Sequence, residues 1–236
     1  MPLIIHRCSR PQELASDAAR MWLDLLRIHP QGKTFTVALS GGRIPKMLYA
    51  ALLASDERRL LDQVDFFWGD ERCVPPNHEE SNYKLAAENL LVRLPSSKER
   101  VHRLRVEQGE EIALAEGESE LRRSADESPS GQPIFDLILL GMGEDGHVAS
   151  LFPNEDELLA GSPAVYRAVT GPKPPPRRIT LGYATISSAR RVWVLASGSG
   201  KENALRKSIA GDGNMPLARV LRSRENTDIF TDIALA

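Results

Sequence analysis

The 236-residue sequence predicts one α/β domain of the doubly wound type, with a single, mostly parallel sheet flanked by helices. Short apolar runs alternate with segments of helical periodicity along most of the chain. The runs are continuously apolar, as in parallel strands that are covered on both faces. The Pro-, Gly- and Ser-rich stretches 124–133 and 170–178 do not separate two complete alternating patterns, so we predict two loops within one domain over residues 1–236.

Four apolar runs are the predicted strands, because each is rich in Val, Ile, Phe or Leu and ends at polar residues or glycine. They are Phe35–Leu39, Val64–Trp68, 135–140 and Val192–Ala196. Helical patterns lie around them, such as 14–28, where apolar residues recur at spacings of three and four, and 110–123, which is charged and expected to be mostly exposed. These helices are 14–28, 47–61, 83–94, 110–123 and 204–209.

Composition narrows the range of partners and compartments. Thirty Lys and Arg residues stand against 32 Asp and Glu residues, so the chain has no global basic field for nucleic acid or acidic lipid. Cys8 and Cys73 have no metal-binding or disulfide-framework spacing. The apolar start of the chain is too short for a signal peptide, and no run approaches the ~18 residues of a membrane span. We therefore expect a cytoplasmic protein without nucleic-acid or membrane partners.

The residues after the first predicted strand, "LSGGRIPKML", have the character of a phosphate cradle. Ser40, Gly41, Gly42 and Arg43 precede Pro45, which we expect at the first position of a helix, where a missing N–H costs nothing. The glycines let backbone N–H groups approach an anion, and the helix N-terminus adds partial positive charge. The spacing differs from a nucleotide P-loop, so a tight turn without a ligand is the alternative.

Charged residues follow the second predicted strand. Arg72 would bind a phosphate or an oxyanion, while Asp70 would accept hydrogen bonds from hydroxyls or position a catalytic group. A solvated loop that contains Asp70, Glu71 and Arg72 is the alternative interpretation. His78 is expected to be an exposed loop residue.

A second phosphate contact is predicted after the last strand, where Gly198, Gly200 and Lys201 stand at a helix start. The alternative is a surface lysine in the first helical turn. Arg177 and Arg178 follow a proline-rich loop, and one of them would also reach an anion unless both are solvated.

The stretch "LGMGEDGHVASLFP" contains G-x-G-x-x-G after a strand, the spacing of a dinucleotide site. Such a site needs a helix and then a second strand that ends in an acidic residue. Pro153 stands seven residues after Gly146, and 154–163 contains no predicted strand, so we reject that interpretation. What remains is a glycine turn that presents Asp145 and His147, as a general base beside a carboxylate.

Together, "LSGG..P", "DER.VP......SNY", "LGMGEDGHVASLFP" and "GSGK" resemble the 6-phosphogluconolactonase family over about residues 35–209. The resemblance implies a Rossmann-like fold of the type shared with glucosamine-6-phosphate isomerases. It also implies hydrolysis of 6-phospho-D-glucono-1,5-lactone in the oxidative pentose phosphate pathway, without a metal or cofactor. The first loop departs from the family, because Arg43 and Ile44 stand where Ser and Thr are usual.

The resemblance and the strand-end residues together give the expected site. The catalytic residues are expected to be His147, Asp145 and Asp70. The substrate- or phosphate-binding residues are expected to be Ser40, Gly41, Gly42, Arg43, Arg72, Gly146, Arg178 and Lys201. His147 would activate a water molecule for attack on C1 of the lactone. The only binding partner expected is the sugar-phosphate lactone itself. We expect a monomer or a weak homodimer.

Two other functions are considered. Glucosamine-6-phosphate deaminases have Phe, Asn and Glu where this chain has Ser150, Leu151 and Phe152, so a deaminase-like isomerase would lack its glutamate. A non-catalytic sugar-phosphate effector domain would follow a DNA-binding helix-turn-helix, for which the residues before Phe35 leave no room. The pair of Asp145 and His147 also favours catalysis.

Overall fold

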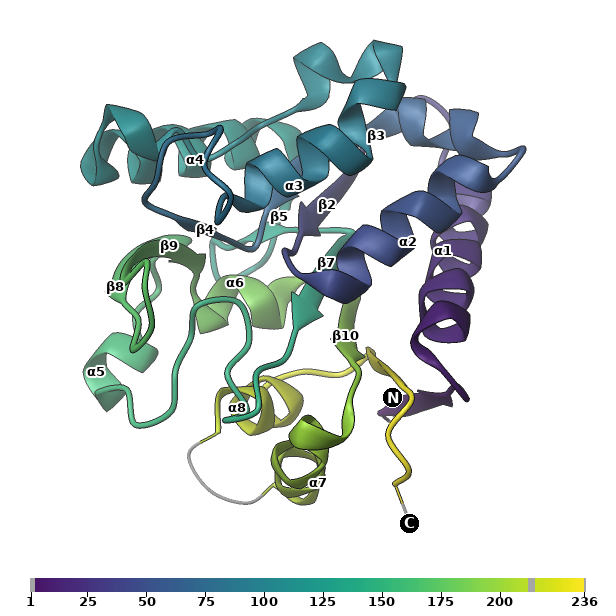
Figure 1. The fold of residues 1–236 in the computed structure, drawn as a ribbon. Helices are drawn as coiled ribbons and strands as arrows, with labels where there is room; N and C mark the ends of the chain where they lie inside the picture. Colours follow the sequence, from purple (N-terminus) through teal and green to yellow (C-terminus); the bar gives the residue numbers. More distant parts are fainter. Residues whose placement is uncertain (1–2, 212–214, 236) are drawn as a thin grey trace.

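Six parallel strands form the central sheet of the described chain, in a computed structural model that describes residues 3–211 and 215–235 (Figure 1). Their order across the sheet is β1 (Ile4–Arg7), β11 (Thr227–Thr231), β10 (Val192–Ala196), β7 (Leu137–Gly141), β2 (Phe35–Leu39) and β3 (Val64–Trp68). The four predicted strands are therefore confirmed as the consecutive centre and one edge of this sheet. Of the predicted run 135–140, the first two residues lie outside β7, where the Asp136 side chain accepts hydrogen bonds from Thr36.

Helices cover both faces of the sheet. On one side lie α1 (Pro11–Ile28) and α2 (Arg43–Ala54), packed against each other (Figure 1). On the other side lie α4 (Glu110–Ser124), α6 (Tyr183–Ser188) and α8 (Pro216–Arg222), and α7 (Glu202–Ala210) packs on α8. Every residue of β2, β3, β10 and β11 is buried, as expected for strands covered on both faces.

The predicted helices 14–28, 110–123 and 204–209 are confirmed, with small differences at their ends. The prediction of one helix over 47–61 is wrong. Helix α2 begins at Arg43, so Pro45 is its third residue and not its first as predicted, and the helix ends at Ala54. A separate 3₁₀ helix, Arg58–Gln63, follows. The Ser55 hydroxyl accepts a hydrogen bond from the Glu57 N–H at 3.1 Å, which favours a turn at this point. The predicted helix 83–94 is likewise α3 (Asn82–Asn89) and a 3₁₀ turn, Leu91–Arg93.

Both predicted loops contain short strands, so the prediction of loops throughout is wrong. The stretch 170–178 overlaps an antiparallel hairpin of β8 (Tyr166–Thr170) and β9 (Arg177–Leu181). Strand β4 (Asp70–Arg72) pairs with the outer side of β9. The stretch 124–133 contains β5 (Asp126–Glu127) and the start of β6 (Pro133–Ile134). The pairing of β9 with β4 left no local signal in the sequence, because these two strands lie far apart along the chain.

The order of the strands reverses between β2 and β7. From β2 the chain moves outward to β3, whereas from β7 it moves in the opposite direction to β10 and β11. The Gly141 N–H, at the end of β7, donates to the Ser40 hydroxyl after β2 at 3.2 Å. Parallel α/β sheets bind ligands at such a reversal, beyond the carboxyl ends of the strands. No described helix is long and apolar enough to cross a membrane.

Candidate active site

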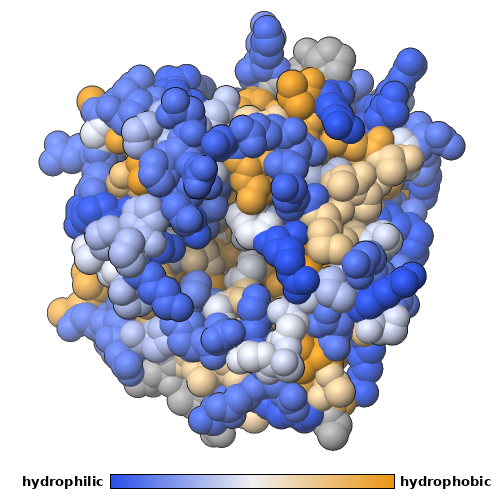
Figure 2. All heavy atoms as spheres, viewed as in Figure 1, coloured by the Kyte–Doolittle hydropathy of each residue, from blue (hydrophilic) through white to orange (hydrophobic). Residues whose placement is uncertain are grey.

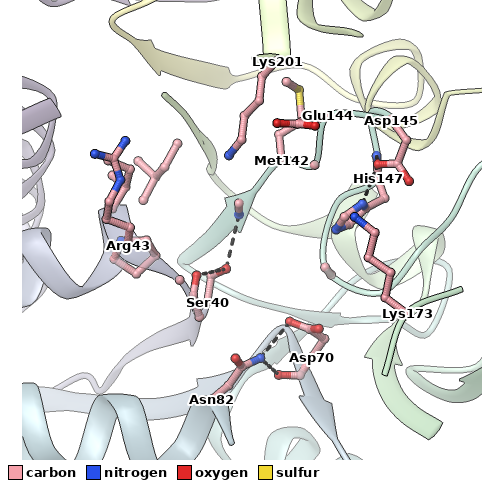
Figure 3. Close-up of a pocket in the computed structure, with 18 of the residues that line it drawn as sticks. Ser40, Arg43, Asp70, Asn82, Met142, Glu144, Asp145, His147, Lys173 and Lys201 are labelled. Carbon is pink, nitrogen blue, oxygen red and sulfur yellow. Dashed lines mark hydrogen bonds and ion pairs between the residues drawn. The ribbon is translucent and has the colours of Figure 1, made fainter. Parts of the chain in front are cut away.

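A cavity of about 800 Å³ opens at this reversal point (Figure 3). Seen as in Figure 1, the molecule is mostly hydrophilic with smaller hydrophobic patches (Figure 2). Every site residue predicted from the sequence lines the cavity except Gly146. Those that do are Ser40, Gly41, Gly42, Arg43, Asp70, Arg72, Asp145, His147, Arg178 and Lys201.

His147 and Asp145 form a hydrogen-bonded pair in the turn after β7 (Figure 3). The distance from His147 Nδ1 to Asp145 Oδ1 is 2.6 Å, and the His147 N–H donates to the same oxygen at 3.2 Å. Partial burial alone would raise the pKa of Asp145, but the hydrogen bonds and charge of His147 outweigh it and hold that pKa below its ordinary value. An ionised Asp145 accepts from Nδ1–H, which leaves the lone pair of Nε2 for a proton.

Two glycines shape the turn that carries this pair. A Cβ on Gly143 would lie 2.1 Å from His147 Nδ1, so the imidazole packs directly on the Gly143 backbone. Gly146 has a φ of +80°, which favours glycine, and a Cβ there would lie 3.1 Å from Met215 Sδ. Gly146 therefore lies against Met215, the residue before α8, and does not face the cavity. Its positive φ allows the backbone to turn before His147.

Asp70 is buried and its two carboxylate oxygens have different partners. Oδ2 accepts from the Ser150 hydroxyl at 2.6 Å, and Oδ1 accepts from Asn82 Nδ2 at 3.2 Å. Asn82 packs so closely on Gly41 that a Cβ there would meet its Oδ1 at 1.9 Å. Asp70 thus joins β4 to α3 and to the segment after His147. The interpretation of 70–72 as a solvated loop is wrong, since Asp70 and Glu71 are 5% and 3% exposed.

Lys201 and Arg43 lie at the end of the cavity next to the Gly41–Gly42 loop (Figure 3). Arg43 Nη2 donates to the Ser197 hydroxyl at 3.1 Å, and Ser197 in turn donates to Asp232. Burial, and then the charge of Arg43, hold the pKa of Lys201 below its ordinary value. Gly42, with a φ of +99°, precedes the first residue of α2. The side chains of Arg43 and Lys201 and the N-terminus of α2 therefore lie together at this end of the cavity.

Arg178, and not Arg177, lines the cavity. Arg177 is exposed and forms an ion pair with Glu110. Arg178 is 7% exposed, and burial and then the charge of Arg72 lower its pKa. Arg72 forms an ion pair with Glu80 at 3.0 Å, and its buried Nε has no hydrogen-bond partner in the described structure.

Four lining residues with polar or charged side chains were not predicted from the sequence, namely Asn82, Glu144, Lys173 and Ser197. Asn82 lies in the quoted "SNY" segment, which was a usable signal. Lys173 lies within a proline-rich stretch that was assigned only as a loop. Burial and the nearby Glu110 raise the pKa of the Cys73 thiol to about 11, so it is not activated. The described residues contain no group of three or more His, Cys, Asp or Glu side chains that could hold a metal ion.

Comparisons with known proteins agree with this arrangement. The family model described as glucosamine-6-phosphate isomerases/6-phosphogluconolactonase matches residues 9–229. A 6-phosphogluconolactonase of Streptomyces coelicolor is 35% identical over 245 aligned residues, which cover 99% of this chain and 93% of that protein. "6-Phosphogluconolactonase 3, chloroplastic" of Arabidopsis thaliana is 34% identical, with 94% of this chain and 70% of that protein covered. The solved 6-phosphogluconolactonase from Trypanosoma brucei superposes with a TM-score of 0.86 at 30% identity, over 98% and 96% of the two chains.

Proposed function

Because the chain belongs to the glucosamine-6-phosphate isomerase/6-phosphogluconolactonase family, we propose that it hydrolyses 6-phospho-D-glucono-1,5-lactone to 6-phosphogluconate, with His147 as general base. This is the lactone-opening step of the oxidative pentose phosphate pathway. The observation that carries the catalytic assignment is the 2.6 Å contact between His147 Nδ1 and Asp145 in the wall of a cavity that is also lined by basic side chains. A base and an anion-binding region in one cavity are what hydrolysis of a phosphorylated lactone requires.

The charge of the cavity favours an anionic substrate. Five basic side chains against three acidic ones give the lining a net charge of +2, with histidine neutral. The basic residues are Arg43, Arg72, Lys173, Arg178 and Lys201, and the acidic residues are Asp70, Glu144 and Asp145. The 6-phosphate would lie against the Gly41–Gly42 loop between Arg43 and Lys201, at the N-terminus of α2. Arg72 and Arg178 add positive charge, and Ser40 holds the cradle to β7.

The reaction begins when His147 Nε2 removes a proton from water, and the water oxygen attacks C1 of the lactone. The π electrons of the C1 carbonyl move to its oxygen, giving a tetrahedral oxyanion. When the carbonyl forms again, the bond from C1 to the ring oxygen breaks, and protonated His147 returns its proton to that oxygen. Asp145 stabilises the imidazolium and fixes the tautomer. Asp70 accepts hydrogen bonds from Ser150 and Asn82, and so holds β4, α3 and the segment after His147 together in the wall of the cavity.

The deaminase alternative has less support at this site. Phe152 stands where the family's deaminases have their glutamate, and its ring centroid lies 5.1 Å from that of His147. A phenyl ring neither orients the imidazole by a hydrogen bond nor transfers a proton. The non-catalytic effector alternative would leave the His147–Asp145 pair without a role.

We include the whole of 1–236 in one sugar-phosphate hydrolase domain, because the family match extends over 9–229. A cytoplasmic location, the absence of a cofactor, and a monomeric or weakly dimeric state stay predictions. Gel filtration with light scattering would test the last of these.

The test of the function is an assay of the purified protein with two substrates in parallel. With freshly prepared 6-phosphogluconolactone, we expect acid release, followed at constant pH, to exceed the spontaneous hydrolysis of the lactone. With glucosamine 6-phosphate, we expect no ammonia release. Ammonia release would support the deaminase, and neither product in the presence of substrate binding would support the effector domain.

A further inference from the structure

Lys173 is a cation at the cavity that the proposed phosphate site does not use. It lies in the loop between β8 and β9, lines the cavity, and extends toward His147 in Figure 3. Within the described residues its ammonium group makes no hydrogen bond or ion pair. Lys201 is also without such a partner in that part of the chain, but it lies across the cavity beside Arg43. The two ends of the cavity thus each present one free ammonium group.

The backbone that carries Lys173 is held in place by Arg178. Arg178 Nη2 donates to the Lys173 carbonyl at 3.3 Å, and Nε donates to the Pro175 carbonyl at 3.0 Å. The Gly171 N–H donates to the Pro176 carbonyl at 2.7 Å, which closes the loop. Proline residues restrict φ and lower the conformational freedom of the segment. The loop is therefore pre-organised before any ligand binds.

The same loop packs on the aromatic side chain that contacts the catalytic histidine. The Arg178 guanidinium lies 5.6 Å from the centre of the Phe152 ring, and that ring lies 5.1 Å from the imidazole. A Cβ on Gly171 would meet Phe152 Cζ at 2.9 Å. Loop, phenyl ring and imidazole therefore form one packed unit. This unit fixes the position of the Lys173 backbone relative to His147.

The other basic groups beside His147 are already engaged. All three nitrogens of Arg178 have protein partners, the third being the Ser150 hydroxyl at 3.5 Å from Nη1. Arg72 is ion-paired with Glu80. The attack on C1 creates a negative charge close to His147, and a pre-organised positive group is what stabilises such a charge.

We propose that Lys173 is a catalytic residue that stabilises the oxyanion formed on the C1 carbonyl oxygen, and that Arg178 is the positioning residue that holds its loop. The inference rests on the proposed lactone hydrolysis. As the π electrons of the carbonyl move to its oxygen, the Lys173 ammonium compensates the new charge and keeps its own proton. That charge disappears when the carbonyl forms again and the ring C–O bond breaks.

The first test compares Lys173→Met, Lys173→Arg and the control Lys207→Met in lactone hydrolysis. Lys207 lies on α7 and does not line the cavity. Loss of one oxyanion-stabilising group commonly lowers kcat about 10²-fold to 10³-fold. Lys173 is exposed in the free protein, and solvent and salt screen its charge. We therefore expect a smaller effect for Lys173→Met, with kcat lowered about 10-fold to 100-fold and KM changed by less than about threefold. Lys173→Arg should restore part of kcat, and Lys207→Met should match the wild type.

The second test separates an oxyanion role from phosphate binding. Glucono-1,5-lactone has the same carbonyl but no phosphate, so Lys173→Met should lower kcat/KM by a similar factor for both lactones. Inorganic phosphate should inhibit Lys173→Met as strongly as the wild type, whereas Lys201→Met should resist this inhibition. A loss confined to the phosphorylated lactone, or weaker phosphate inhibition, would make Lys173 a phosphate ligand and overturn the inference.

The outcomes also separate this inference from the function on which it rests. If the wild type hydrolyses the lactone and Lys173→Met keeps its kcat, Lys173 is a solvated loop lysine and only the inference fails. If the wild type does not hydrolyse the lactone, the proposed function fails as well.

Discussion

At the scale of single residues, the geometry of the site depends on Gly143 as directly as on His147. The imidazole occupies the space that a Cβ on Gly143 would need, with Nδ1 2.1 Å from that position. The Gly143 N–H also donates to the His147 carbonyl at 2.9 Å, so the turn closes on itself. A substitution here should move the histidine without removing any functional group.

Gly143→Ala should therefore lower kcat for the lactone by about 10²-fold, because a misplacement of about 1 Å in a catalytic group costs on that order. The unfolding midpoint should change little, since the turn lies at the surface of the cavity. The matched control is Gly69→Ala, where a Cβ would make only ordinary contact, 3.5 Å from the Leu39 carbonyl oxygen. Wild-type kcat in Gly143→Ala would show that the imidazole does not need this position.

Most of the candidate site residues could be predicted from the sequence because they follow strands directly, as Ser40 and Asp70 do. Lys173 and Asn82 could not be assigned in this way, since each reaches the cavity through packing between distant segments. Asn82 is fixed by Asp70 and Gly41, and Lys173 by Arg178. The partner that holds each of them is known only from the fold.

At the scale of elements, Glu71 connects β4 to the start of α3. Its buried carboxylate accepts from the N–H groups of Asn82 and Tyr83 at 2.8 and 2.7 Å, and from the Ser81 hydroxyl at 3.1 Å. It also accepts from the Arg72 N–H at 2.8 Å. One carboxylate thus satisfies free donors at the helix N-terminus and in the strand before it.

Glu71→Gln should lower the free energy of unfolding by about 2 to 3 kcal/mol, because an amide NH₂ would replace one accepting oxygen and leave buried N–H or O–H donors without an acceptor. Urea denaturation of the variant and the wild type measures the difference. Glu79→Gln, at an exposed position between β4 and α3, is the control and should leave stability unchanged within about 0.5 kcal/mol. Equal stability of Glu71→Gln and the wild type would contradict this role of Glu71.

Elements with a local signal could be predicted, and elements that depend on distant pairing could not. The central strands are continuous apolar runs, so β2 and β10 were predicted with their observed bounds. Strand β11 has three buried polar residues, Thr227, Asp228 and Thr231, and therefore does not look like a continuous apolar run. The buried Asp228 carboxylate is stabilised by His6 of β1, whose Nε2 lies 2.7 Å from Asp228 Oδ1. Strand β9 has its distant partner in β4, more of the chain lying between these two strands than between β9 and β8.

At the scale of the whole molecule, the doubly wound class could be predicted from the alternation of elements, but the strand order could not. The reversal between β2 and β7 brings Ser40, Gly141 and the turn of Asp145 and His147 to one crevice. The added sheet of β4, β9 and β8 closes that crevice with Arg72 and Arg178. The fold thus assembles residues from distant parts of the chain at the cavity.

The stability of the molecule in acid should depend on Asp65, which joins β3 to the segment before α4. Burial alone would raise the pKa of Asp65, but His102, Ser124 and Arg100 outweigh it and hold the pKa below its ordinary value. A carboxylate with a depressed folded-state pKa contributes stability that is full above its unfolded pKa of about 3.9. That contribution is lost as the pH falls through the folded-state pKa.

Asp65→Asn should therefore be less stable than the wild type by about 1 to 3 kcal/mol at pH 7. The difference should shrink as the pH falls below about 4, in urea denaturation measured over a pH series. A difference that stays constant into acid would show that the charge of Asp65 contributes nothing.

If His147 is the base in lactone hydrolysis, loss of its imidazole must lower kcat, and the variant His147→Gln measures this loss. We expect the catalysed rate to fall at least about 10²-fold, the lower end of the usual contribution of a general base, with the unfolding midpoint unchanged. His78→Gln, at an exposed histidine outside the cavity, should keep wild-type kcat. A folded His147→Gln that hydrolyses the lactone at the wild-type rate would show that His147 is not the base.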